Sequence, residues 1–170
     1  MNTIGYHGTI KKNAMMILKN GFDVNKCTKR NDHWLGRGIY FFTEKEFAEW
    51  WVDKKSDMAI LSCSIVCDDE RVLNLDNFMA NFKFQQKCKE YELKYKPAFK
   101  NENQYRATMI ELYKSDYDVD VIIYTFEVYG GTFYQKHLLD KEISKSMKLF
   151  LPQKQICVNN VSVISNIKEE

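Results

Sequence analysis

The sequence predicts an α+β fold in which a mostly antiparallel β-sheet is flanked by helices. Runs rich in Val, Ile, Tyr and Phe have the composition of strands, and other stretches repeat apolar residues every three or four positions, as amphipathic helices do. The predicted strands are residues 3–7, 39–42, 59–66, 71–75, 119–128 and 156–164. The predicted helices are residues 10–20, 43–54, 76–95 and 101–114. No internal repeat, low-complexity segment or linker interrupts them, so residues 1–170 are expected to form one domain.

The composition is that of a protein with a packed core. Of the 170 residues, 45% are hydrophobic and 14% are aromatic, which argues against disorder, and the formal net charge is only +2. No apolar run approaches the roughly 20 residues that cross a membrane, and the first residues lack the basic and apolar blocks of a signal peptide. We therefore expect no membrane partner and a cytoplasmic location.

The five cysteines are an odd and scattered set, which fits reduced thiols better than a disulfide framework. Cys63 and Cys67 are close in sequence, but no second Cys or His pair at metal-ligand spacing accompanies them. We expect no zinc site and no other metal centre.

Polar loops and helix boundaries organise the first third of the chain. The helix at 10–20 is expected to end at Gly21. Residues 23–37 form a polar loop whose His33-Trp34 pair is either a lid over a site or ordinary loop packing. The sequence Thr43-Glu44-Lys45-Glu46 has the Thr-x-x-Glu pattern of a capping box, so a helix is predicted to begin there. Trp50 and Trp51 follow on that helix, and two adjacent tryptophans cannot both face the same side.

The middle of the chain is predicted to hold a hairpin and then a helical insert at about 76–115. Residues 68–70 form a turn that would pair the strand at 71–75 with the strand at 59–66. Between Phe82 and Arg106 there are six Lys and one Arg against three Glu, a local balance of 7 − 3 = +4, with aromatic residues interleaved. This pattern suits single-stranded nucleic acid, or a helix pair with a solvated basic face.

The last third is rich in predicted β-structure. The run at 119–128 is strongly strand-forming, Gly130-Gly131 marks a turn, and residues 132–135 are a candidate return strand. A final apolar strand is predicted at 156–164, and residues 168–170 are expected to be a frayed tail.

Two short motifs carry the chemistry: Tyr6-His7-Gly8-Thr9 near the start, and Gly36-Arg37-Gly38-Ile39-Tyr40-Phe41 before the second predicted helix. Glycines at 36 and 38 permit positive φ and close backbone approach, and the apolar run after them delivers Tyr40 at the start of a strand. In order and spacing these motifs resemble the ADP-ribosyltransferase superfamily, in its poly(ADP-ribose) polymerase and diphtheria-toxin branch. The resemblance covers the first fifty or so residues well and the remainder only thinly.

The resemblance implies a split, mostly antiparallel sheet and a site for NAD as co-substrate. The Gly8 backbone would pair with the nicotinamide amide, the His7 ring with the adenosine-side ribose, and Thr9 would add a hydroxyl. Gly38 would leave room at the flexible rim beside Tyr40, whose ring would stack on the nicotinamide. Trp51 occupies the place of a second stacking aromatic, with Trp50 as the substitute.

The chain departs from the family at the acid that the resemblance implies, because Gln155 stands at that position. An amide accepts a hydrogen bond from a ribose hydroxyl, but it carries no charge and cannot act as a base. Transfer is expected to be slowed by one or more powers of ten, and chain elongation is the activity most affected. Gln153 weakly resembles the first position of a Gln-x-Glu pattern. Glu127 and Glu142 are alternative carboxylates.

The resemblance implies an NAD-dependent mono-ADP-ribosyltransferase with Gln155, Tyr40 and His7 as catalytic residues. It would act on a protein or nucleic-acid acceptor, as an intracellular toxin, defence factor or modifying enzyme. One alternative is a binding module that holds NAD or ADP-ribose without turnover, and another is a nucleic-acid-binding domain that uses the basic insert. A third is an RNA-repair phosphotransferase, although the basic winged domain expected of it is missing.

Overall fold

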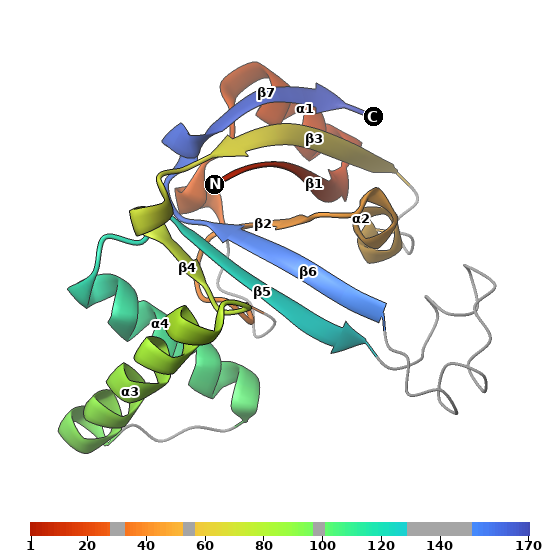
Figure 1. The fold of residues 1–170 in the computed structure, drawn as a ribbon. Helices are drawn as coiled ribbons and strands as arrows, with labels where there is room; N and C mark the ends of the chain where they lie inside the picture. The colour runs from red at the N-terminus through yellow and green to blue at the C-terminus, as the bar shows by residue number, and fades with distance from the viewer. Residues whose placement is uncertain (28–32, 53–56, 97–100, 129–150) are drawn as a thin grey trace, which may run out of the picture.

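The computed structural model describes residues 1–27, 33–52, 57–96, 101–128 and 151–170. It is an α+β structure built on one mixed seven-stranded sheet, with strand order β4-β5-β6-β2-β1-β3-β7 (Figure 1). The strands are β1 (Asn2–Ile10), β2 (Ile39–Phe42), β3 (Met58–Val66), β4 (Val72–Asn74), β5 (Val121–Val128), β6 (Leu151–Val158) and β7 (Ile164–Glu169). Only β4 and β5 pair in parallel, so the predicted α+β class and the mostly antiparallel sheet are confirmed.

Four α-helices flank the sheet: α1 (Lys11–Asn20), α2 (Lys45–Val52), α3 (Phe78–Tyr95) and α4 (Glu102–Asp116). Figure 1 shows α1 beside β3 and β7, and α3 with α4 beside β4 and β5 at the other end of the sheet. Asn77 and Asn101 begin α3 and α4, since each side chain accepts a hydrogen bond from the first turn of its helix. None of the helices among the described residues is long and apolar enough to cross a membrane.

The central strand β2 is buried on both faces, and its side chains alternate between separate clusters. In β2, Ile39 and Phe41 join the cluster that includes Ala14 of α1, whereas Tyr40 packs against the cluster under α3 and α4. Phe42 belongs to a third, smaller cluster with Phe47, Ala48, Val52 and Ile60 around α2. This alternation follows from the two-residue period of a strand. It sends successive β2 side chains to opposite faces at the place where the cavity described below opens.

The predicted hairpin of residues 59–66 and 71–75 is wrong. β4 pairs in parallel with β5 at the opposite end of the sheet from β3. Arg71 explains why β4 pairs with β5. Its guanidinium donates to both carboxylate oxygens of Asp120, at 2.6 and 2.8 Å, and Asp120 comes just before β5. The Asp120 amide in turn donates to the Arg71 carbonyl at 2.9 Å. A bidentate ion pair therefore docks β4 on β5.

The predicted single strand at 156–164 and the predicted frayed tail are also wrong. β6 ends at Val158, and the Asn160 side chain caps a 3-10 turn, Val161–Val163, before β7 begins. Residues 168–169 lie in β7, paired with β3, and the Glu170 amide donates to the Ile60 carbonyl at 3.0 Å. Glu170 also accepts a hydrogen bond from Ser62, which lowers the pKa of its carboxyl. The turn predicted at Gly130-Gly131 and the strand at 132–135 lie outside the described residues.

Candidate functional site

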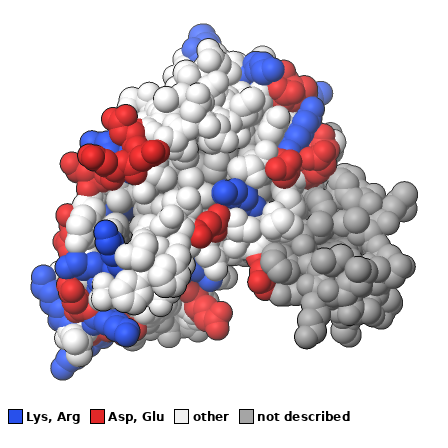
Figure 2. Space-filling view, viewed as in Figure 1, with Lys and Arg blue, Asp and Glu red and all other residues white. Residues whose placement is uncertain are grey.

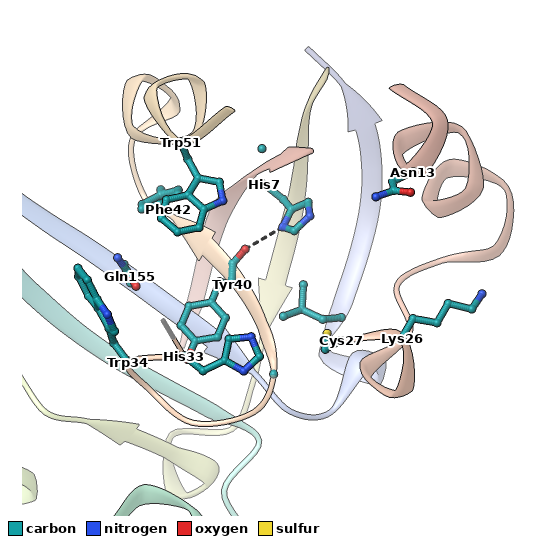
Figure 3. Close-up of a pocket in the computed structure, with 13 residues that line it drawn as sticks. His7, Asn13, Lys26, Cys27, His33, Trp34, Tyr40, Phe42, Trp51 and Gln155 are labelled. Carbon is teal, nitrogen blue, oxygen red and sulfur yellow. Dashed lines mark hydrogen bonds between the residues drawn. The ribbon is translucent and has the colours of Figure 1, made fainter. Parts of the chain in front are cut away.

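A cavity of about 270 Å³ opens between β1, β2, the C-terminal half of α2 and the segment of residues 33–38 (Figure 3). Six of the predicted site residues lie on its wall, although they come from four separate parts of the chain. Its lining is His7, Gly8, Asn13, Lys26, Cys27, His33, Trp34, Gly38, Ile39, Tyr40, Phe42, Trp51 and Gln155. The fold therefore gathers the predicted site residues, with the exception of Thr9, in one place.

The cavity lies where β1 and β2 separate. The register between these strands joins Tyr6 to Phe42 and extends no further toward Tyr40. Beyond that point the His7 ring replaces a strand partner, because its Nδ1 lies 2.9 Å from the Tyr40 carbonyl oxygen. A carbonyl only accepts, so Nδ1 carries the proton. Edge contacts with Phe22 and Phe41, at centroid distances of 5.2 and 5.7 Å, also orient the ring.

Tyr40 links the cavity floor to the segment above it. Its hydroxyl donates to the Gly36 carbonyl at 2.6 Å and accepts from the Leu35 amide at 2.8 Å. Burial raises the pKa of this hydroxyl far above its ordinary value, so it stays protonated and keeps donating. The His33 ring stacks on Tyr40 at 5.5 Å between centroids. These contacts attach the Tyr40 ring, which was predicted to stack on a ligand, to the 33–38 segment.

Helix α4 fastens the same segment from the other side. The Arg37 amide donates to Glu111 Oε1 at 2.6 Å, and Lys114 Nζ donates to the Arg37 carbonyl at 3.1 Å. Lys114 and Glu111 also form an ion pair with each other at 2.8 Å. Gly36 has φ of +79°, and a Cβ there would meet Glu111 Oε1 at 2.4 Å. Helix α4 of the predicted insert therefore holds the loop beside the cavity, which sequence reasoning did not foresee.

The two tryptophans of α2 face differently. Trp51 lines the cavity, is 39% exposed and lies 6.3 Å from the Phe42 ring between centroids. Trp50 is partly buried and packs against the small cluster around α2. The helix periodicity that separates neighbouring residues thus puts Trp51 on the cavity side, as Figure 3 shows.

Gln155 lies in the middle of β6, opposite Phe42 of β2 and Tyr124 of β5. It is 6% exposed, lines the cavity, and donates from Nε2 to Gln153 Oε1 at 2.9 Å. Its Oε1 is thereby the atom left to accept a hydrogen bond from a ligand. Gln153 is 2% exposed, and its own Nε2 has no hydrogen-bond partner among the described residues. The pair thus contains a buried donor with no acceptor.

Three predicted residues have structural roles that the sequence did not reveal. A Cβ on Gly8 would lie 2.4 Å from the Ala48 carbonyl oxygen, and a Cβ on Gly38 would lie 2.5 Å from Cys157 Sγ. Both glycines therefore allow close packing within the protein, and positive φ occurs at Gly36 but not at Gly38. Thr9 is buried, is absent from the cavity wall, and accepts a long hydrogen bond of 3.5 Å from Asn13.

The described wall of the cavity contains no carboxylate. Lys26 is its charged side chain, and Asn13, His33, Cys27 and Gln155 are polar. Glu127 is an exposed residue of β5 and does not line the cavity, while Glu142 lies outside the described residues. Among the described residues, no group of three or more His, Cys, Asp and Glu side chains is placed to hold a metal ion.

The lining residues that were not among the predicted site residues include Asn13, Lys26, Cys27 and Phe42. His33 and Trp34, which the sequence offered as a candidate lid, both line the cavity. Lys26 ends the short 3-10 turn Val24–Lys26 after α1, Cys27 follows it, and Asn13 lies on α1 itself. Figure 3 shows Asn13, Lys26 and Cys27 on the side of the cavity away from Trp34 and Gln155. The polar loop at 23–37 was the one available indication, because His33 and Lys26 both belong to it.

The fold and the cavity define an α+β protein with a small aromatic-walled cavity. No protein-family model matches the chain, and no solved structure matches it. The chain is similar to the uncharacterized protein MJ0359 of Methanocaldococcus jannaschii, at 25% identity over 196 residues that cover 96% of this chain and 85% of that protein. That name states no activity, so the function is argued from the cavity alone.

Proposed function

We propose that this chain binds NAD in the cavity and transfers one ADP-ribose unit to a macromolecular acceptor in the cytoplasm. The single observation that carries the proposal is the gathering of His7, Tyr40, Trp51 and Gln155 around one cavity. These are the side chains that the family resemblance assigns to NAD, and they come from β1, β2, α2 and β6. A cavity of about 270 Å³ is close to the small end of ligand pockets, about 300 Å³, and suits the nicotinamide and its ribose.

Each residue has a separate task in the proposed reaction. The Tyr40 ring, with Trp51 and Phe42, forms an aromatic wall for the nicotinamide, and His7 contacts the adenosine-side ribose. Gln155 accepts a hydrogen bond from a hydroxyl of the nicotinamide-side ribose through Oε1. The bond between the nicotinamide nitrogen and the sugar C1 breaks, and nicotinamide leaves with the bonding electron pair. The acceptor's nucleophile then donates its electron pair to C1 and loses a proton.

The neutral amide limits the proposed reaction to single transfers. The sugar develops positive charge as nicotinamide leaves, and a carboxylate would stabilise that charge more strongly than Gln155 does. An amide also cannot take a proton from a ribose hydroxyl, which elongation of a polymer requires. We expect label from NAD at single sites on an acceptor, and no ladder of polymer on a denaturing gel.

A second candidate is a module that binds NAD or ADP-ribose without turnover. It is favoured by one observation, the lack of any Asp or Glu among the described residues of the cavity wall. Both candidates require NAD binding, and only the first requires release of nicotinamide. Measuring free nicotinamide after incubation with NAD therefore separates them.

NAD is expected to raise the melting temperature of the wild-type chain by about 5–10 °C when its concentration is about 100 times its Kd. Trp51→Ala should remove most of this shift, because it deletes one aromatic wall of the cavity while α2 keeps its buried contacts. Phe78→Ala is the matched control, since this ring is 78% exposed on α3 and does not line the cavity. No shift of the wild type at millimolar NAD would contradict the proposal.

Cys27 offers a test that needs no turnover. It lines the cavity and is partly buried, whereas Cys63, Cys67, Cys88 and Cys157 are buried. Burial raises the pKa of the Cys27 thiol, so alkylation by iodoacetamide should be slow at neutral pH and faster as the pH rises and thiolate forms. NAD is expected to slow labelling of Cys27 severalfold, as measured by peptide mass spectrometry. Equal labelling with and without NAD would contradict occupation of this cavity.

A further inference from the structure

A ledge of aromatic side chains continues from the cavity toward α4. Trp34 lines the cavity and meets Phe126 of β5 edge-on, with 4.8 Å between ring centroids. Tyr124 contacts the same Phe126 ring at 4.8 Å. The Arg106 guanidinium of α4 lies over Phe126 and Tyr124, at 5.2 and 5.8 Å from their centroids. We call Trp34, Tyr124, Phe126 and Arg106 the aromatic ledge.

The members of the aromatic ledge differ in exposure in a way that suits a binding surface. Phe126 is buried, at 8% exposure, and supports the other three from beneath. Trp34, Tyr124 and Arg106 are each only partly buried. Trp34 and Arg106 therefore both contact the same buried ring and both keep part of their surface accessible.

The Arg106 guanidinium makes few polar contacts within the protein. Its Nη1 donates to the Asn103 side chain at 3.2 Å, and no carboxylate lies within ion-pair distance of it among the described residues. Arg71, in contrast, is held by both oxygens of Asp120. A guanidinium has five N–H donors in a planar fork that matches phosphate oxygens. Arg106 thus has donors left for an anion from outside the protein.

The surroundings of the aromatic ledge favour a polyanion. The described cavity wall has no carboxylate. Helix α3, which packs beside α4, carries exposed Lys83, Lys89 and Lys94 together with exposed Glu90 and Glu92. Figure 2 shows Lys and Arg side chains, interspersed with carboxylates, over this helix pair at the lower left. Phe78 and Phe82 of α3 are also exposed and stacked, 6.3 Å apart. Cations interleaved with exposed rings suit a single-stranded nucleic acid.

We propose that the aromatic ledge holds a single-stranded nucleic acid as the acceptor, an inference that rests on the proposed function. One base stacks on Trp34, and the neighbouring phosphate accepts hydrogen bonds from Arg106. Because Trp34 lies on the same cavity wall as Gln155, a nucleotide in this place would be next to the ribose from which nicotinamide leaves. A carboxylate could also pair with the Arg106 fork, but it offers no planar base to stack on Trp34.

The test measures how the full chain binds a fluorescein-labelled, mixed-sequence single-stranded DNA in the absence of NAD. Fluorescence anisotropy reports the binding at low and at moderate salt. The wild type should bind, with an affinity that falls as salt rises. Arg106→Gln should weaken binding about tenfold. Arg106→Lys should recover only part of the affinity, because a lysine keeps the charge and loses the planar fork. Lys12→Gln, which removes an exposed charge from α1, should bind within about twofold of the wild type.

Three outcomes would overturn the ledge as an acceptor site: no binding by the wild type at low salt, undiminished binding by Arg106→Gln, or an equal loss in Lys12→Gln. The last would show that binding depends on net charge alone. Circular dichroism of Arg106→Gln checks that the variant is folded. Because the oligonucleotide assay contains no NAD, its failure is separate from a failure of the NAD-dependent thermal shift, which tests the proposed function.

Discussion

Gln155→Glu is expected to raise the rate of NAD hydrolysis at least about tenfold, equivalent to about 1.4 kcal/mol of barrier. The new carboxylate would face the sugar cation that develops as nicotinamide leaves. The surroundings can accept it, because Gln153 can rotate its amide and present Nε2, a buried donor with no hydrogen-bond partner in the described part of the chain. The present hydrogen bond between the two amides would thus be replaced by a charge-assisted one. Free nicotinamide measured by chromatography reports the rate.

Two further variants make this measurement decisive. Trp51→Ala combined with Gln155→Glu should cancel the gain, because the carboxylate acts only on NAD held in the cavity. Gln155→Ala should lower any wild-type transfer. Transfer that survives Gln155→Ala undiminished would assign the chemistry to another residue, such as Glu142. Gln155→Glu that binds NAD and hydrolyses none would favour the binding module over the enzyme.

The elements of this fold were predictable wherever a local pattern determines them. Helical periodicity located α1, α3 and α4, and β-branched and aromatic runs located β2, β3 and β5. The strand partners were not predictable in the same way. β4 follows a short acidic turn, which predicts a hairpin with β3. The ion pair of Arg71 with Asp120 instead holds β4 against β5, and it joins residues that are 49 positions apart in the sequence.

The end of the chain shows the same limit. Residues 156–164 are apolar enough for one continuous strand, but the Asn160 side chain turns the backbone before β7. Residues 168–169 are charged and suggest a tail, yet they lie in β7 at the edge of the sheet, where charged side chains face solvent without cost. A pattern of hydrophobicity does not distinguish an edge strand from a tail.

For the candidate site, the sequence motifs predicted several residues that line the cavity, but they did not predict which other residues contact them. Spacing along the chain suggested His7, Tyr40, Trp51 and Gln155, and all four line one cavity. The hydrogen bonds of Glu111 and Lys114 with the Arg37 backbone could not be predicted from the sequence. They depend on how α4 packs against a loop more than seventy positions away. Long-range polar contacts of this kind carry no local pattern.

Gly8→Ala is expected to destabilise the chain by about 1–3 kcal/mol, because the added methyl has no room. Its Cβ would lie 2.4 Å from the Ala48 carbonyl oxygen and 2.9 Å from Val52 Cγ1. The nearer atom belongs to the backbone of α2, so a change of side-chain rotamer cannot relieve the contact. The helix would have to move away from β1, and Trp51 would move with it. Urea unfolding with and without NAD measures both effects.

Two companion variants separate packing at Gly8 from ordinary glycine effects. Gly21→Ala adds a methyl into open space, but at φ of 77° and ψ of 176° the backbone lies in a region that essentially only glycine adopts. It should cost about 1–3 kcal/mol of backbone strain and leave the NAD-dependent stabilisation unchanged. Val52→Ala combined with Gly8→Ala should recover little stability, since the contact with the Ala48 oxygen persists. A Gly8→Ala variant as stable as the wild type, with NAD stabilisation lost, would contradict the packing role. It would mean that Gly8 meets the ligand directly through its backbone, as the family resemblance implies.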